Sequence, residues 1–168
     1  AAAVIRDAVP DVEVLVIGPT DEDPDYFASC QRRVAELKLE NTVSFTGRMN
    51  IFDIIPSLDV MLLTSISEAQ PLVLLEAGAA RIPCVATDVG SCREIIEGPP
   101  GEDPPLGRGG FIVPPMDPHA LGAAVIRLLL DEALRKACGE TLRARVEHGF
   151  TSETSSDAYA ALYRELSA

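Results

Sequence analysis

The sequence lacks tryptophan altogether and is poor in aromatic residues, which make up 5% of its 168 positions. Aliphatic side chains must therefore form most of the core, and the hydrophobic share of 47% is sufficient for one. Long apolar runs are also absent. None reaches the roughly 18 residues of a membrane-spanning helix, and the first residues do not have the pattern of a signal peptide. We therefore expect one globular domain over residues 1–168, soluble and cytoplasmic.

Positive charge is scarce in the chain. It has 14 lysine and arginine residues against 26 aspartate and glutamate residues, which gives a formal net charge of −12. With no local basic patch, this charge repels nucleic acid and anionic membrane surfaces. We expect no nucleic-acid partner.

The cysteines form no C-x-x-C pair and stand far apart, at Cys30, Cys84, Cys92 and Cys138. Such spacing favours neither a zinc site nor a small disulfide scaffold. We predict reduced thiols and no metal site.

Five short apolar runs, rich in β-branched residues, are each followed by polar, glycine or proline residues; they cover residues 12–18, 42–47, 59–65, 82–90 and 109–115. Helical patterns fill most of the gaps, and alternation of strand and helix is typical of a doubly wound α/β domain with a parallel, Rossmann-like sheet. After the last run, residues 117–166 indicate three helices, a helical carboxy-terminal tail. The Gly- and Pro-rich stretch 97–110 is expected to be a loop.

In open α/β sheets, ligands bind at the carboxyl ends of the strands, so residues 18–24, 46–50, 64–70 and 88–91 are the loops of interest. None carries a G-x-G-x-x-G or P-loop signature. After residues 59–65, Pro71 suits the first position of a helix, where its missing N–H costs nothing. The free amides of that first turn, with the helix dipole, would form an anion site that suits phosphate.

Two glutamates flank this helix start. Glu68 precedes it, and Glu76 lies about six residues into it, roughly 9 Å further along the axis. The two acids could hold different parts of one elongated ligand. Glu68 could equally be a dipole partner of the helix, and Glu76 a solvated surface residue. Because the neighbours of Glu76 are apolar, we expect its carboxylate to be hydrogen-bonded.

The segment "SEAQPLVLLEAGAARIPCVATDVGS", residues 67–91, resembles the E-x7-E signature of retaining glycosyltransferases of family 4, which have the GT-B fold of two facing Rossmann-like halves. Further matches are "LVIGP" at 15–19, "VSFTGR" at 43–48 and "GGFIVPPMDPHALGAAVIRLL" at 109–129. Within that family, the sequence of these segments most resembles the glycosyltransferases of bacterial Pel exopolysaccharide synthesis. The resemblance implies the carboxy-terminal, donor-binding half of an enzyme that transfers a hexose from a UDP-sugar with retention of anomeric configuration.

The resemblance also implies roles for individual residues. Glu68, the expected catalytic residue, approaches hydroxyls of the donor sugar, and Glu76 binds the ribose hydroxyls. The turn formed by Ala69, Gln70, Pro71 and Leu72 holds the diphosphate, Arg48 contacts the base, and Gly90 and Ser91 form a small-residue turn beside the site. Arg48 could equally be a solvated surface arginine. The donor is a substrate, so no cofactor is expected.

One departure from the family concerns the amino-terminal end. The sequence has no initial methionine, and residues 1–9 have the pattern of the last turns of a helix that Pro10 stops. The arginine and lysine that hold the donor phosphates in the family precede this helix and have no counterpart here. We therefore expect a fragment of a larger two-domain enzyme, inactive by itself. Its expected partners are the absent amino-terminal acceptor domain and an inner-membrane polysaccharide synthesis complex.

The first strand of the fold is also expected to be absent. In the strand order 3-2-1-4-5-6 it would lie between the strands at 12–18 and 59–64. Those two strands should be separated by a gap, be paired directly, or receive a strand from another copy.

Three alternatives remain open. One is a nucleotide-sugar epimerase or phosphorylase of the same fold. The second is a non-catalytic, flavodoxin-like binding module. The third is a response-regulator-like domain, which the acidic run Asp21–Asp23 suggests but for which no lysine partner is positioned.

Overall fold

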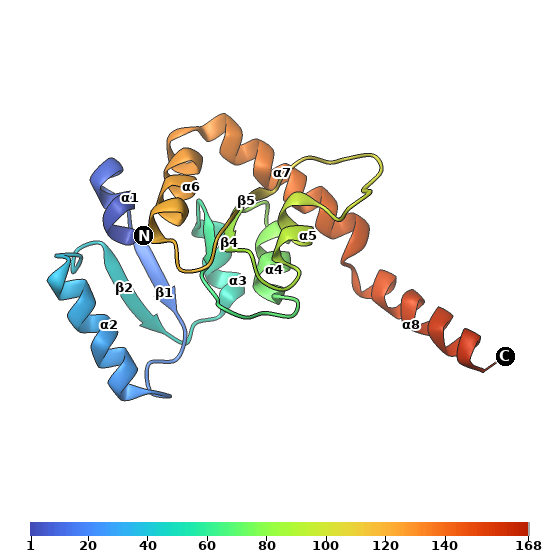
Figure 1. Ribbon diagram of the computed structural model, residues 1–168, viewed down its shortest axis with the longest axis horizontal. Helices are drawn as coiled ribbons and strands as arrows, with labels where there is room; N and C mark the ends of the chain where they lie inside the picture. Colours follow the sequence, from blue (N-terminus) through green and yellow to red (C-terminus); the bar gives the residue numbers. More distant parts are fainter. Residues whose placement is uncertain (168) are drawn as a thin grey trace.

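The computed structural model describes residues 1–167 and shows an α/β fold in which all strand pairs are parallel (Figure 1). Each predicted strand region contains one strand. One sheet pairs β1 (Val14–Ile17) with β2 (Val43–Gly47), and the other has the order β3 (Met61–Leu63), β4 (Cys84–Thr87), β5 (Gly110–Val113). The predicted α/β class with parallel strands is confirmed.

Helices connect the strands, and most begin where the sequence supplies a cap. The helices are α1 (Ala2–Ala8), α2 (Pro24–Glu36), α3 (Ile51–Ile54) with the 3-10 turn Ile55–Ser57, α4 (Leu72–Ala79), α5 (Cys92–Glu97), α6 (Pro118–Leu130), α7 (Glu132–Gly149) and α8 (Ser152–Leu166). Asp23, Asp117 and Asp131 each accept a hydrogen bond from an amide in the first turn of the helix that follows. Such caps satisfy amides that have no partner within the helix.

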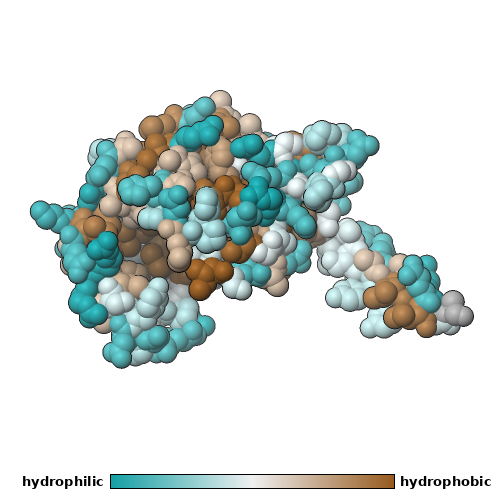
Figure 2. All heavy atoms as spheres, viewed as in Figure 1, coloured by the Kyte–Doolittle hydropathy of each residue, from teal (hydrophilic) through white to brown (hydrophobic). Residues whose placement is uncertain are grey.

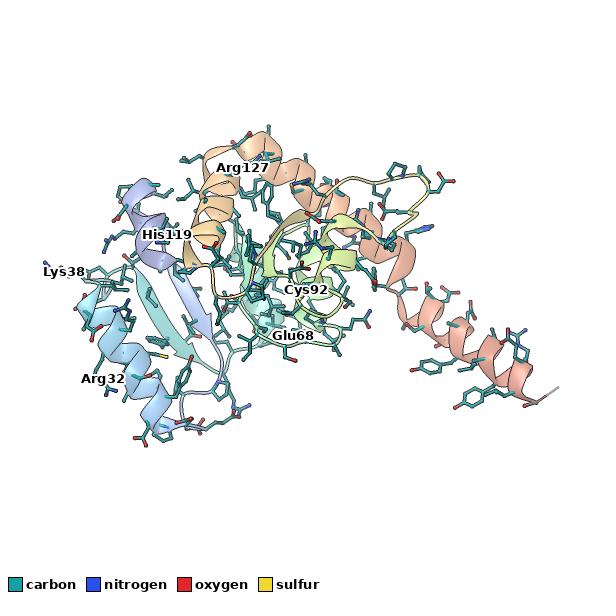
Figure 3. All side chains as sticks on the ribbon, in the orientation of Figure 1. Arg32, Lys38, Glu68, Cys92, His119 and Arg127 are labelled. Carbon is teal, nitrogen blue, oxygen red and sulfur yellow. The ribbon has the colours of Figure 1, made fainter. Side chains whose placement is uncertain are left out.

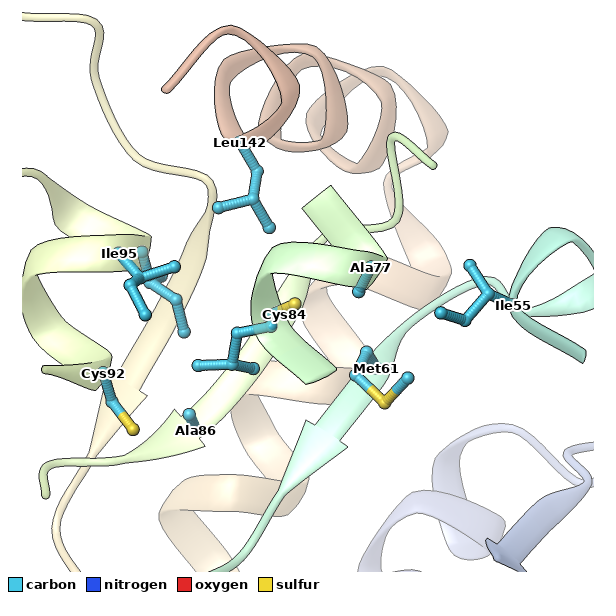
Figure 4. Packing of buried hydrophobic residues seen from close by; sticks show 10 residues of the cluster. Ile55, Met61, Ala77, Cys84, Ala86, Cys92, Ile95 and Leu142 are labelled. Atoms are coloured by element: carbon cyan, nitrogen blue, oxygen red, sulfur yellow. The ribbon is translucent and has the colours of Figure 1, made fainter. Parts of the chain in front are cut away.

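The core lies on both faces of β4, whose four residues are all buried. Cys84 and Ala86 face a cluster that includes Leu74, Ile95 and Leu142, part of which is shown in Figure 4. Val85 faces the opposite cluster, built mainly from α6 and β5. Alternation of neighbours along one buried strand follows from the two-residue period of side chains in a sheet.

The two sheets are separate. Among residues 1–167, β1 pairs only with β2 and β3 only with β4. A groove of about 860 Å³ lies between β1 and β3, and Figure 2 shows apolar atoms in the recess between the two parts. Of the three arrangements expected from the sequence, the structure has the gap, and direct pairing of the two strands is wrong.

The carboxy-terminal tail comprises α6, α7 and α8, as the sequence predicts. Helices α6 and α7 contribute buried residues to the core, whereas α8 contributes none and projects from the body (Figure 1). Tyr159, Leu162, Tyr163 and Leu166 make an exposed apolar stripe on α8. Among the described helices, none is both long enough and apolar enough to span a membrane.

Candidate functional site

The loop 64–71 joins β3 to α4 at the carboxyl edge of the larger sheet. Pro71 is buried and stands one residue before the helix, as its N-cap residue with φ −76° and ψ 110°. The prediction that Pro71 occupies the first helical position is therefore off by one residue. An extended ψ keeps its carbonyl available, and the Leu74 amide donates to it over 3.2 Å.

The amino-terminal end of α4 is exposed to solvent. Its N-cap provides no side-chain acceptor, and Ala69, Gln70 and Leu72 are all exposed. First-turn amides of a helix have no acceptor within the helix and carry the positive end of its dipole. This turn can therefore accept an anion, as the sequence predicts for phosphate.

Glu68 is held in place by a chain of hydrogen bonds. The Ser65 hydroxyl donates to Glu68 Oε1 over 2.6 Å, and the hydroxyl of the buried Thr87 donates to the Ser65 carbonyl oxygen over 2.5 Å. Thr87 is the last residue of β4, so the chain anchors the loop to the central strand. The carboxylate of Glu68 is half-buried and forms no ion pair with the described residues.

Gly90 and Ser91 pack directly on this loop. Gly90 has φ +52°, and a Cβ atom there would overlap the carbonyl oxygens of Glu68 and Ala69. The Ser91 amide donates to the Ala69 carbonyl over 2.9 Å, while the Ser91 hydroxyl oxygen is buried without a partner among residues 1–167. The structure thus brings together Glu68, Ala69, Gly90 and Ser91, as the resemblance implies.

Glu76 lies on α4, half-buried, and no hydrogen bond or ion pair to its carboxylate occurs within the described residues. The expected hydrogen bond is therefore not made to another of the described residues, and the predicted contact of Glu76 with a ligand stays a prediction. Its side chain is open enough for water to solvate the charge, so burial does not demand a protein partner. Close packing holds α4 in position, because Gly78 lies against the side chains of Leu142 and Val146 of α7.

Arg48 lies apart from the other predicted site residues. It follows β2, on the far side of β1 and of the groove, and is exposed. Its guanidinium forms an ion pair with Glu22 over 2.6 Å. Its predicted contact with the base stays a prediction.

Sequence reasoning missed Ser65 and Thr87. The available signal was a threonine at the end of an otherwise apolar strand, since a buried hydroxyl there needs an acceptor.

Cys92 also borders the site (Figure 3). Burial raises the pKa of its thiol, and the nearby Glu68 carboxylate adds to the increase.

The arginine of the neighbouring helix α5 already forms ion pairs. Arg93, in the first turn of α5, contacts Asp88 over 2.6 Å and also pairs with Glu97. These carboxylates, the hydrogen bond to Asp88 first, raise the pKa of Arg93. In the described part of the chain, no cluster of three or more His, Cys, Asp or Glu residues could hold a metal ion.

Comparison with known proteins identifies relatives over most of the chain. A profile described as "Glycosyl transferases group 1" matches residues 1–131. The N-acetyl-alpha-D-glucosaminyl L-malate synthase of Bacillus anthracis is 32% identical over 157 residues, which is 93% of this chain and 38% of that protein. The capsular polysaccharide biosynthesis glycosyltransferase CapM of Staphylococcus aureus is 29% identical over 84% of this chain and 35% of that protein. The chain thus spans less than half the length of these relatives.

Solved structures show the same fold. A sucrose-phosphate synthase from Thermosynechococcus elongatus matches 98% of this chain and 42% of its own, with a TM-score of 0.76 and 25% identity. The carboxy-terminal domain of a group 1 glycosyl transferase from Francisella tularensis matches 90% of this chain and 76% of its own, with a TM-score of 0.76 and 25% identity. Anabaena HepE, solved with UDP-glucose, matches 96% of this chain and 44% of its own, with a TM-score of 0.79 and 23% identity. The fold is that of the carboxy-terminal domains of GT-B glycosyltransferases.

Proposed function

The chain belongs to the glycosyl transferases group 1 family, and on this premise we propose that it is the donor-binding part of an enzyme that transfers a hexose from a UDP-sugar to an acceptor. The observation that carries the proposal is the placement of Glu68 and Glu76 on either side of the open start of α4. Three groups follow one another along the loop and helix: a carboxylate, the free amides of the first turn, and a second carboxylate. They match the order of sugar, diphosphate and ribose in a nucleotide sugar.

In the proposed complex, Glu68 accepts hydrogen bonds from hydroxyls of the donor hexose and is the catalytic residue. The turn Ala69 to Leu72 binds the diphosphate through its amides and the helix dipole; Pro71 contributes its backbone geometry rather than a donor. Glu76 accepts hydrogen bonds from the ribose hydroxyls, since its carboxylate has no partner among residues 1–167. Gly90 and Ser91 pack against the turn and support its backbone, and Arg48 contacts the base of the nucleotide.

The finer assignment is to retaining enzymes of family 4, whose E-x7-E signature the two glutamates resemble. We propose exopolysaccharide synthesis of the Pel type as the setting, supported in part by the capsular polysaccharide role in the name of one relative. UDP-glucose is the proposed donor, supported by the complex of the structurally similar HepE. Reaction would take place in the cytoplasm, with the acceptor held by an amino-terminal domain, beside an inner-membrane synthesis complex.

A non-catalytic, flavodoxin-like module is the rival from another class. It would be favoured by an occluded loop or by glutamates held in ion pairs. Neither feature occurs among residues 1–167, since Ala69 and Gln70 are exposed and no ion pair involves Glu68 or Glu76. An epimerase or phosphorylase of the same fold would be distinguished by product analysis with labelled donor, because only a transferase needs an acceptor.

The binding proposal is tested by titrating the isotope-labelled chain with UDP-glucose and following its amide resonances. We expect the largest shifts at Ala69, Gln70, Leu72 and Gly90, and none of comparable size on α8. Replacing Glu76 with glutamine should weaken binding by about 10- to 100-fold, because a charge-assisted hydrogen bond contributes about 1.5–3 kcal/mol. Shifts confined to other surfaces would contradict the proposed site.

The matched control is Glu153→Gln, which removes an exposed glutamate from the projecting helix α8 and should leave affinity unchanged. The catalytic proposal requires the complete polypeptide that carries these residues. There, Glu68→Gln should abolish most turnover, while Glu153→Gln should not. Normal turnover in the Glu68 variant would exclude its catalytic role.

A further inference from the structure

A second cavity, of about 560 Å³, lies between α5, the carboxy-terminal end of α7 and the loop 98–109 that joins α5 to β5. Figure 1 shows this loop, in yellow, beside α7. None of the residues assigned to the candidate site lines the cavity, which we call the α7 pocket. Sites for small molecules commonly have volumes of about 300–1,000 Å³, so the α7 pocket has room for one.

A buried ion pair forms part of the wall of the α7 pocket. Arg145, on α7, is 2% exposed, and its Nε and Nη2 atoms donate to the two carboxylate oxygens of Glu102 over 2.7 and 3.1 Å. Its remaining donors bind the main-chain carbonyl oxygens of Ile95, Ile96 and Gly107. A guanidinium group has five N–H donors, and here each of them has an acceptor. Arg145 is therefore neutralised and has no donor left for an anionic ligand.

Much of the remaining wall is apolar. The apolar side chains that line the pocket are Pro99, Pro104, Leu106, Ala144 and Phe150. Leu106 and Phe150 are half-buried, so part of each side chain is still in contact with water. A ligand that covers these surfaces removes apolar area from water, which is favourable. The pocket therefore suits a ligand with an apolar body.

The unpaired carboxylates of the pocket give it a negative charge. Glu94 on α5 and Asp103 in the loop are exposed lining residues, and neither forms an ion pair within residues 1–167. Ionised carboxylates only accept hydrogen bonds, and the net charge of −12 adds a field that attracts cations. A ligand complementary to this wall therefore carries a positive charge and hydrogen-bond donors.

We propose that the α7 pocket binds a small organic amine with an aromatic body. The carboxylates of Glu94 and Asp103 attract its ammonium group, and its ring packs against Leu106 and Phe150. An aromatic body is favoured because one ring gains from offset or edge-to-face packing on another, such as that of Phe150. A lysine side chain of a partner protein would bring the same charge, but its thin aliphatic stem would leave most of the cavity unfilled.

The α7 pocket is separate from the proposed donor site, although α5 borders both. Cys92 begins α5 beside the candidate site, and Glu94 lies in the first turn of the same helix. The inference does not depend on the proposed function, because an amine in the α7 pocket and a nucleotide sugar at the start of α4 are detected through different amides. Failure of one therefore leaves the other intact.

The test titrates the isotope-labelled chain with benzylamine, as its ammonium ion, at constant pH and ionic strength. We expect saturable shifts of the amide resonances of Leu106, Ala144, Gly149 and Phe150, with a dissociation constant of about 1–10 mM for a probe of about eight non-hydrogen atoms. Three matched probes separate the contributions. Benzyl alcohol has the same ring without the charge, benzoate has the opposite charge, and butylamine has the charge on a lysine-like stem.

Benzylamine should bind most tightly of the four probes. We expect benzyl alcohol and butylamine to bind about threefold or more weakly and benzoate about tenfold or more weakly. The double variant Glu94→Gln, Asp103→Asn should weaken benzylamine binding about tenfold and leave benzyl alcohol binding unchanged. Both positions are exposed, so the fold should persist. The matched control is Glu153→Gln, Asp157→Asn, which removes the same charge from the projecting helix α8 and should change neither affinity.

Several outcomes would overturn the proposal. Benzoate that binds as tightly as benzylamine would show that the carboxylates do not select the ligand, and an unaffected double variant would show the same. Butylamine that binds as tightly as benzylamine would assign the pocket to a lysine side chain of a partner protein. Shifts that spread over other acidic surfaces, or no saturable shift at benzylamine concentrations about tenfold above the expected dissociation constant, would show that the α7 pocket is not a site for amines.

Discussion

Replacing Gly90 with alanine should damage the candidate site through the backbone rather than through lost chemistry. Gly90 combines a left-handed backbone, φ +52°, with direct packing on the Glu68 and Ala69 carbonyls, which a Cβ atom would overlap. The chain cannot relieve the overlap by moving a side chain, because the opposing atoms belong to the backbone. The loop 64–71 must therefore shift relative to Ser91, whose amide holds the Ala69 carbonyl.

The expected magnitude has two parts. A left-handed backbone costs a residue with a Cβ atom about 1–2 kcal/mol, and overpacking against fixed atoms adds about 1–3 kcal/mol. The matched control is Gly101→Ala, where φ is +83° and no neighbouring atom lies within 4 Å of the added Cβ. That variant experiences the backbone cost alone, so the difference between the two variants isolates the contact with the loop.

Chemical denaturation gives the free energy of unfolding of both variants. We expect Gly90→Ala to lower it by about 2–5 kcal/mol and Gly101→Ala by about 1–2 kcal/mol. In a UDP-glucose titration, Gly90→Ala should also weaken binding, whereas Gly101→Ala should not. Equal losses of stability in the two variants, or unchanged affinity in Gly90→Ala, would refute the argument that Gly90 shapes the turn.

Three further predictions concern other contacts. Ser65→Ala, measured in the complete polypeptide, should lower kcat about tenfold or more by releasing Glu68, since a hydrogen bond to a charged group contributes about 1.5–3 kcal/mol; Ser65→Thr should restore most of it, and an unchanged kcat in Ser65→Ala would exclude the role. The hydrogen bond from Arg145 lowers the pKa of Glu102 below its ordinary value of 4.5. That stabilisation is complete above pH 4.5 and is lost as the pH falls through the lower pKa of the folded state. Thermal midpoints measured from pH 6 to 3 should therefore fall less steeply in Glu102→Gln, and parallel curves would contradict this. Iodoacetamide should modify Cys30 first in the native chain, as mass spectrometry can show, because the other three thiols are buried and burial raises the pKa of each; early labelling of any of them would contradict the packing at Cys84, Cys92 and Cys138.

Much of the fold could be predicted from local pattern. The apolar, β-branched run at 12–18 contains β1, and the buried run at 82–90 contains β4, because a parallel strand covered on both faces needs little else. Likewise, the helix start near residue 71 follows from a proline before an apolar segment. The error of one residue at Pro71 reflects the similar backbone φ of the N-cap and first helical positions.

The site was predictable only in part. The spacing of Glu68 and Glu76 along the chain determines their separation along α4, so their relation to the helix start needed no tertiary information. That Glu76 has no partner within the described part of the chain was not predictable, because its apolar neighbours in sequence lie on several faces of the helix and do not report exposure. The anchoring of Glu68 through Ser65 to Thr87 joins residues 22 positions apart, a distance at which local periodicity carries no information.

By itself, the sequence determined the α/β class, the succession of strands and helices, and the order of acid, helix start and acid in the loop after β3. These depend on the backbone preferences and periodicity of neighbouring residues. Only the tertiary structure decided that Gly90 supports the Glu68 turn, that Thr87 anchors Ser65, and that β1 and β3 face each other across an apolar groove. Those features arise where distant segments meet, and their geometry depends on how the sheet, α4 and α6 pack together.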